Sequence, residues 1–386
     1  MQYMASYSLK RFARIQIIKA ITPRGLRKFL SPYAGYLARR GFDIGRIGDD
    51  LTDSDARDIL SVLIHPDAGI PQSLVDALYH VDEMATQNGM ELIVSEFRQA
   101  GYDLECCPPT PADVAVLAWI TDSSLFEQVF ARQHHRSART FRLYAGGPVN
   151  GLPEPLDESR TAAFEDELND WSDAMMLGRH CKLFPFIDDH EHCYIVRRGQ
   201  PFTRVSAIDG DKSSSIIFQP EAFDIVAYDV RMRQLRVASN SRAARDIYRR
   251  LAGKHLFGNE DHFSDRPLFS LLPLVRKGKD ALVCDDVPGL VEVRLRKVQI
   301  ADDASRKNTI TWEGENIHED PEFVRRCSRS AQVSRILLGF RLVGAVRARS
   351  FEMRPPNVIV LPRDEDIVPI GQFLKFRGFI TEGSAA

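Results

Sequence analysis

The spacing of apolar residues changes once along this chain, and that change constrains the fold more than any other sequence feature. Through about the first 135 residues the apolar positions recur every three to four residues, as after Pro71, where Leu74 and Val81 face inward. From about residue 181 the period becomes two, which is typical of strands. Because the strands cluster rather than alternate with helices, the sequence predicts an α+β fold with a mostly antiparallel sheet.

Local signals place the individual elements. Thr22 and Thr110 each precede a proline, which is the pattern of a helix N-cap. Asp53 or Ser54 is expected to cap another helix, and Asn88-Gly89 is expected to end one. A helix is predicted at 241–252. The predicted strands are 183–187, 194–197, 216–218, 225–228, 235–238, 282–284, 291–298, one long strand at about 337–353, and 358–361.

A segment rich in glycine and proline at 145–158 reads as a linker. The sequence therefore predicts a helical domain at 1–136, with a basic start and an acidic body, and an α+β domain at 159–300. Residues 301–386 are expected to form a basic C-terminal helix and hairpin that packs on the α+β domain.

Charge is zoned along the chain although the net charge is only −2. Residues 1–50 carry a net charge of +7 and residues 51–125 carry −11. Residues 151–195 carry −8, 224–260 carry +4 and 326–386 carry +5. Zones of this size either neutralise each other within the fold or create local potentials that steer partners.

Two groups of arginines are candidates for a partner contact. One group lies on a single face of the predicted helix at 241–252, and the other lies on the C-terminal helix and along one face of the long strand. The residues are Arg242, Arg245 and Arg249, then Arg325, Arg329, Arg341, Arg347 and Arg349. Guanidinium groups in rows suit the phosphates of a nucleic acid. They also suit acidic surfaces, either internal or on a partner protein.

The densest group of potential metal ligands is the segment 180–193. If it is one strand, Asp188, His190 and His192 share a face, and such a set suits Zn²⁺ or Fe²⁺. His180, Cys181 and Cys193 lie nearby as further candidates. The spacing matches no standard zinc motif, and a polar turn between two strands is the favoured interpretation of the segment.

Other chemistries lack a sequence signal. No glycine-rich nucleotide loop and no nucleophile motif of the GxSxG type occurs. His134-His135 lies among arginines and is interpreted as a basic surface patch. The six cysteines form no disulfide framework, and no run of about 20 apolar residues occurs, so we expect a reducing compartment and no membrane contact.

These observations favour a non-catalytic binding or adaptor protein that acts in a larger assembly through its zoned charge. Arginine outnumbers lysine 40 to 11, which is typical of a GC-rich bacterial genome, and a cytoplasmic location is expected. The expected partners are proteins, with nucleic acid and a second copy of the chain as open alternatives. The competing hypothesis is a metal-dependent hydrolase built on Asp188, His190 and His192, with Zn or Fe as the only cofactor considered.

Overall fold

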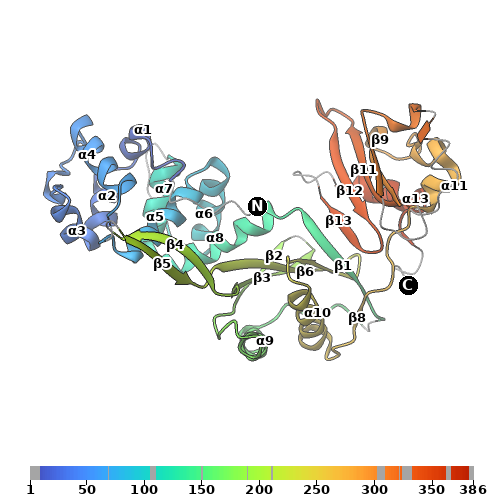
Figure 1. Cartoon of the computed structure of the whole chain (residues 1–386), viewed down its shortest axis with the longest axis horizontal. Coiled ribbons are helices and arrows are strands. Elements are labelled where there is room, and N and C mark those ends of the chain that lie inside the picture. The colour runs from blue at the N-terminus through green and yellow to red at the C-terminus, as the bar shows by residue number, and fades with distance from the viewer. Residues whose placement is uncertain are drawn as a thin grey trace. The chain divides into compact units, whose positions relative to one another are not determined.

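The computed structural model describes residues 9–67, 69–104, 110–148, 151–188, 190–209, 212–301, 309–320, 322–323, 333–361 and 367–381 (Figure 1). The chain divides into two compact units, Met1–His134 and His135–Ala386. Helices fill the first unit and most strands belong to the second, which confirms the predicted α+β class. Among the described residues, no helix combines the length and the apolar character needed to span a membrane.

Short helices with polar caps build the N-terminal unit. They are α1 (Ile15–Lys19), α2 (Pro23–Leu30), η1 (Ser31–Tyr33), α3 (Ala34–Arg39), η2 (Ile44–Arg46), α4 (Asp53–Ile64), α5 (Gln72–Met84), α6 (Gln87–Gln99), α7 (Pro111–Thr121) and α8 (Ser123–Ser137), whose last residues belong to the second unit. The Thr22 and Thr110 hydroxyls accept backbone N–H groups at the starts of α2 and α7, as predicted.

Two predicted helix boundaries are wrong by a few residues. The cap of α4 is Thr52, whose hydroxyl accepts the N–H of Asp55, rather than Asp53 or Ser54. Asn88-Gly89 does not end a helix, because both residues lie in the first turn of α6 behind its cap, Thr86. In each case a threonine one or two residues upstream competes successfully for the cap position.

Opposite charges meet inside the N-terminal unit. Ion pairs join the basic start of the chain to the acidic segment that follows it: Lys10–Glu83 at 2.6 Å, Lys19–Asp53 at 2.5 Å, Arg40–Asp67 at 2.9 Å and Arg46–Asp58 at 2.8 Å. Asp82 is buried and accepts the backbone N–H groups of Lys10, Arg11 and Phe12. Part of the zoned charge therefore neutralises itself within this unit.

An antiparallel sheet of 11 described strands organises the C-terminal unit. Its order is β10-β9-β11-β12-β13-β1-β7-β6-β3-β2, and β8 also pairs with β1. The strands are β1 (Thr140–Gly146), β2 (Lys182–Asp188), β3 (Glu191–Gly199), β6 (Glu221–Asp229), β7 (Gln234–Ala238), β8 (Phe263–Ser264), β9 (Leu290–Ala301), β10 (Thr309–Glu313), β11 (Val333–Leu342), β12 (Arg349–Arg354) and β13 (Val358–Val360). Strands from residues 159–300 and 301–386 thus share one sheet.

β1 joins the two halves of this sheet. One edge pairs with β7, with Tyr144 opposite Leu235, and the other edge pairs with β13, with Phe141 opposite Ile359. β1 is absent from the predicted strands, because Arg139 and Arg142 give its segment the pattern of a charged surface. Residues 147–148 and 151–157 lie between β1 and α9 and belong to the predicted linker at 145–158, whose first two residues are in β1.

Two helices cover one face of the β1-β7-β6-β3-β2 half, α9 (Glu158–Ala174) and α10 (Arg242–Phe257) (Figure 1). Phe164 and Leu168 of α9 pack in one buried cluster with Tyr248 and Leu251 of α10. Side chains of alternate strand positions, including Tyr194, complete this core. Because one face of these strands is fixed in the core, every second residue must lie on the opposite face.

The other half contains α11 (Leu272–Lys277), η3 (Gly278–Leu282), η4 (Ile317–Glu319) and α13 (Ile367–Phe376). Phe340 of β11 meets Phe373 of α13, with ring centroids 5.5 Å apart. Several predictions for this half are corrected by the structure. Residues 337–353 form two strands, because Gly344 adopts a φ of +78° and turns the chain between β11 and β12. The predicted strand at 282–284 is absent, because Leu282 ends the 3₁₀ helix η3 and the two residues after it form no strand.

Candidate functional site

Asp188, His190 and His192 do not share a face. Asp188 ends β2, His190 lies in the turn and His192 lies in β3, so the segment is the alternative polar turn between two strands. The register places Asp188 opposite Glu191 and Ile187 opposite His192. His192 therefore lies on the core face, where its ring meets that of Tyr228, while Asp188 lies on the other face. The predicted three-residue metal site is wrong for this reason.

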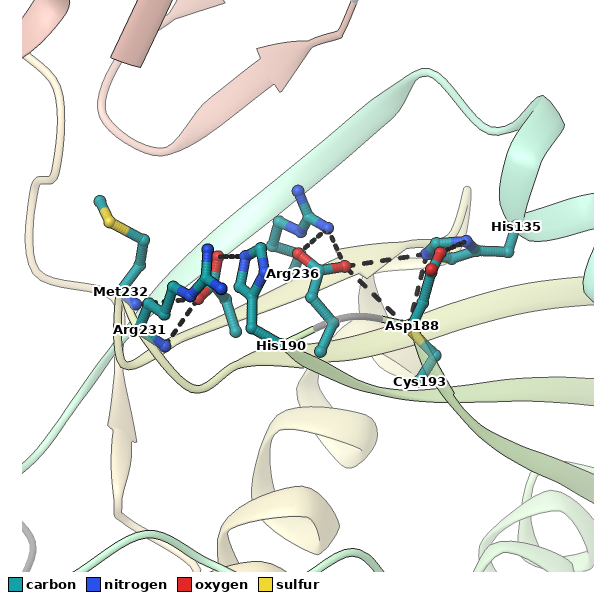
Figure 2. Close-up of polar contacts among 9 residues, drawn as sticks. His135, Asp188, His190, Cys193, Arg231, Met232 and Arg236 are labelled. Carbon is teal, nitrogen blue, oxygen red and sulfur yellow. Dashed lines mark hydrogen bonds and ion pairs between the residues drawn. The ribbon is translucent and has the colours of Figure 1, made fainter. Parts of the chain in front are cut away.

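A different cluster forms on the face that carries Asp188 (Figure 2). His135, near the end of α8, meets Glu191 and Cys193 of β3. The His135 Nε2 atom lies 3.6 Å from Cys193 Sγ and 4.0 Å from Glu191 Oε2, and Cys193 Sγ lies 4.0 Å from the same oxygen. These three donor atoms, one nitrogen, one oxygen and one sulfur, lie within 4.8 Å of one another.

Strand register brings these side chains together. Glu191 and Cys193 are two residues apart in β3, so both point away from the core face. Cys193 pairs with Ala227, and Ala227 pairs with Arg236 of β7, which places Arg236 on the same face. Arg236 donates to both carboxylate oxygens of Glu191. The sheet thus fixes the acid, its arginine partner and the thiol without help from any loop.

Burial dominates the electrostatics of the cluster. Glu191 and Cys193 are buried, and His135 is nearly so. Removal of Glu191 from water raises its pKa above the ordinary value, the nearby Arg236 opposes that rise, and Asp229 adds to it. A buried carboxyl group of this kind is stabilised by any further positive charge placed at its oxygens.

The second nitrogen of His135 faces Asp188. Nδ1 lies 3.8 Å from Asp188 Oδ2, and the imidazole ring meets the ring of Phe186 edge to face, with centroids 5.4 Å apart. The imidazole therefore lies between a thiol and a carboxylate, as Figure 2 shows. Such an arrangement can hold a metal ion or draw a proton from the thiol. Because Cys193 has no exposed surface, a nucleophilic reaction with a bulky substrate is disfavoured.

A second group, His190, Glu191 and Asp229, also gathers potential ligands. Its geometry is that of a turn. One oxygen of Asp229 accepts the N–H groups of Arg231 and Met232 at 2.9 and 2.8 Å, and the other lies 3.3 Å from His190 Nε2. Asp229 is thus engaged in shaping the β6–β7 turn.

The arginine row on α10 is not a continuous cationic surface. Arg245 Nη1 donates to the Ser239 carbonyl at 2.6 Å, and Arg249 Nη1 donates to the Phe263 carbonyl at 2.5 Å. Only Arg242 of the three is widely exposed, at 90%, and it lies 4.0 Å from Asp246. Two of these arginines therefore position backbone around the helix, which helical spacing alone could not show.

The C-terminal arginines are also arranged differently from the prediction. Arg325 and Arg329 lie outside the described residues. Phe340 pairs with Arg349, so Arg341 and Arg349 lie on opposite faces of the sheet, and Arg347 lies in the turn between their strands. Arg341 lies 3.3 Å from Glu292 Oε2. The prediction that these arginines share one strand face is therefore wrong, because the turn at Gly344 changes which residues of the two strands lie on the same face.

One further feature of the C-terminal unit is a hairpin that leaves the sheet. β4 (Thr203–Asp209) and β5 (Lys212–Phe218) pair with each other and with no other described strand. They continue the β3–β6 pair beyond Pro201 and Pro220, where the ladder to the rest of the sheet ends (Figure 1). We call the described residues 200–209 and 212–220 the arm. Every residue of β5 is exposed.

No family model matches this sequence, and a search of curated proteins found no match. The functional interpretation therefore depends on the geometry of the chain itself.

No local pattern in the sequence groups His135 with Cys193. The two residues are 58 positions apart, and His135 was interpreted as part of a surface patch. The available signal was weak: if 191–197 forms one strand, Glu191 and Cys193 share a face, opposite Tyr194 and Val196. Polar side chains on one face of a strand predict ligands or ion pairs. The third residue, His135, comes from the end of a helix that is distant in sequence, so no local pattern could add it.

Proposed function

We propose that this chain is a non-catalytic bacterial binding protein that acts in the cytoplasm within a larger assembly and docks a protein partner through the arm. The observation that supports the proposal most directly is the exposure of large apolar side chains on an isolated hairpin. Ile208 is 85% exposed and Ile217 is 67% exposed, and Ile216, Phe218 and Phe202 are exposed as well. Patches of this kind mark interaction surfaces.

Both faces of the arm carry exposed apolar side chains among polar ones. The register places Ile208 and Ile217 on one face, and Val205, Ile216 and Phe218 on the other. A lone two-stranded hairpin with nothing packed on it is marginally stable in water. The arm therefore gains most from a partner that covers it, and its stability is expected to rise on binding.

The chemistry of the arm favours a protein that presents a strand. Each of its strands has one edge without a partner among the described strands, and such an edge can accept an added strand. Arg204 and Lys212 are its only basic residues, whereas β5 also carries a run of three serines, 213–215. A surface with so few cations does not suit a phosphate backbone.

The experiment is photo-crosslinking in the native host. A photoreactive amino acid replaces Ile208, and the control places it at Val346, which is 99% exposed in the β11–β12 turn. We expect an adduct with one defined protein from position 208 and none from position 346. Ile208→Ser combined with Ile217→Ser should weaken binding of that purified protein at least tenfold, whereas Val346→Ser should leave it unchanged.

Other outcomes would replace this proposal. An adduct between two copies of the chain, with a doubled mass by light scattering, would make the arm a homo-oligomer contact. Absence of any adduct at position 208 would contradict docking through the arm.

Nucleic-acid contact stays a prediction, and a separate measurement addresses it. Binding to labelled DNA or RNA across a salt series should weaken steeply with salt if phosphates are neutralised. Arg242→Glu with Arg347→Glu is the suitable variant, because Arg245 and Arg249 also hold backbone carbonyls and their loss would disturb the fold. Salt-sensitive binding that this variant abolishes would favour a nucleic-acid partner over the arm-docked protein.

A further inference from the structure

We propose that His135, Glu191 and Cys193 bind one zinc ion, a property independent of docking through the arm. Zn²⁺ binds imidazole nitrogen, carboxylate oxygen and thiolate sulfur in tetrahedral geometry. Its usual bond lengths place neighbouring ligand atoms about 3.3–3.6 Å apart. The three separations here are 3.6, 4.0 and 4.0 Å, so shifts of a few tenths of an ångström would close the shell.

The charges of the cluster balance around such an ion. A Cys193 thiolate, Glu191 and Asp188 contribute three negative charges, and Arg236 contributes one positive charge. A divalent cation brings the sum to zero. Asp188 is 59% exposed, so only the thiolate, Glu191 and Arg236 are removed from water. Burial makes an uncompensated charge costly, so this charge set is compatible with one divalent ion and not with two.

The surrounding contacts match those of a metal site. A histidine that binds zinc commonly donates its other N–H to a carboxylate, and Asp188 lies 3.8 Å from the Nδ1 atom of His135. A ligating carboxylate is in turn held by a donor, and Arg236 holds Glu191. In this proposal Asp188 is not a metal ligand. It lies next to His135 and orients the imidazole that binds the metal.

The donor set decides which metal fits. Non-haem iron sites commonly use two histidines and one carboxylate. Here His192 lies on the core face and His190 pairs with Asp229, so neither supplies a second imidazole to this group. A thiolate with one imidazole favours zinc. Three protein ligands leave one position for water. Because Cys193 has no exposed surface, we expect the ion to tie His135 to β3 and not to act on a bulky substrate.

The test is metal binding by the purified, reduced full-length chain after removal of metal with a chelator. Cobalt(II) serves as the probe, because a thiolate ligand gives a near-ultraviolet charge-transfer absorption and a tetrahedral site gives intense visible bands. We expect one cobalt per chain, both spectral features, and displacement by one equivalent of zinc. Mass spectrometry of the metal content of untreated protein supplies an independent count.

Variants assign the ligands. Cys193→Ser should abolish the charge-transfer absorption, and His135→Gln should lower metal affinity at least a hundredfold. Asp188→Asn should lower affinity by about 10–100-fold while the spectrum is retained. Cys284→Ser is the matched control, since Cys284 is another buried thiol of the same unit, and it should change neither the spectrum nor the affinity. Circular dichroism confirms that each variant is folded.

Two results would overturn the proposal. One is a folded, reduced wild-type chain that binds no cobalt and contains no zinc. The other is a cobalt spectrum that persists in both Cys193→Ser and His135→Gln but disappears in His190→Gln, which would place the ion on the His190–Asp229 group.

Discussion

At the scale of single residues, a buried charge network fastens α10 to the sheet. Arg198 Nε donates to Asp224 Oδ2 at 2.6 Å, and the Tyr248 hydroxyl donates to the same oxygen at 2.9 Å. All three residues are buried, and burial next to Asp224 raises the pKa of Tyr248 well above its ordinary value. The tyrosine therefore keeps its proton and donates this hydrogen bond at neutral pH.

Asp224→Asn should destabilise the C-terminal unit strongly. The substitution leaves the guanidinium of Arg198 buried without its counter-charge, which costs about 3–5 kcal/mol. Asp265→Asn removes the exposed partner of Arg142 and should cost no more than about 1 kcal/mol. Chemical denaturation of the two variants measures both values. Equal losses would show that the buried network does not hold this core.

Buried histidines should make the free energy of unfolding decrease as pH falls. Burial lowers the pKa of His262, whose ring stacks on Phe257 with centroids 3.7 Å apart, and burial also lowers the pKa of His318. In the unfolded chain each titrates near its usual value of about 6.5, so the unfolded state takes up protons first as pH falls. Stability is therefore complete above about pH 6.5 and declines as pH falls toward the lower folded-state pKa values.

The check is the pH dependence of the unfolding free energy for the wild type and for His262→Gln. The variant should show a shallower decline between pH 7 and pH 5, because it binds one proton fewer on unfolding. His65→Gln is the control at an exposed histidine and should keep the wild-type slope.

At the scale of elements, the arm is separable from the sheet that carries it. Gly199 and Glu221 form the last β3–β6 pair, and the Gln200 N–H donates to the Pro220 carbonyl. Replacement of residues 201–219 by Asn-Gly would close this ladder with a tight turn. We expect the melting temperature to change little, because the arm strands pair with each other and with no other described strand. Partner binding should disappear. A large loss of stability would show instead that the arm supports the sheet.

Local sequence signals were sufficient for elements whose cause is local. Threonine caps at 22 and 110 and the strands around 183–187 and 225–228 follow from the residues within each segment. Errors arose where one residue redirects the chain, as Gly344 does between β11 and β12. The candidate site shows the same limit, since register between β2 and β3 decides which of Asp188 and His192 faces the cluster.

At the scale of the whole molecule, the sheet links segments far apart in sequence. β9 pairs with β10 and β11, and β1 pairs with β13, so strands after residue 301 cover edges formed before it. Truncation after residue 300 should therefore leave two strands with open edges and give aggregation. Truncation after residue 381 leaves every described strand and should give soluble, folded protein. Soluble yield and thermal unfolding compare the two, and a stable protein ending at 300 would contradict this view.

The position of β1 also has a consequence in time. During synthesis β7 emerges about 90 residues after β1. β13, the neighbour on the other edge, does not emerge until about 210 residues after β1. At roughly 5–20 residues per second, one edge of β1 waits on the order of 10–40 s for its neighbour. A nascent chain with an unclosed strand edge is a substrate for ribosome-associated chaperones. The rate of translation between residues 146 and 358 is thus expected to govern how much of this protein reaches its folded state.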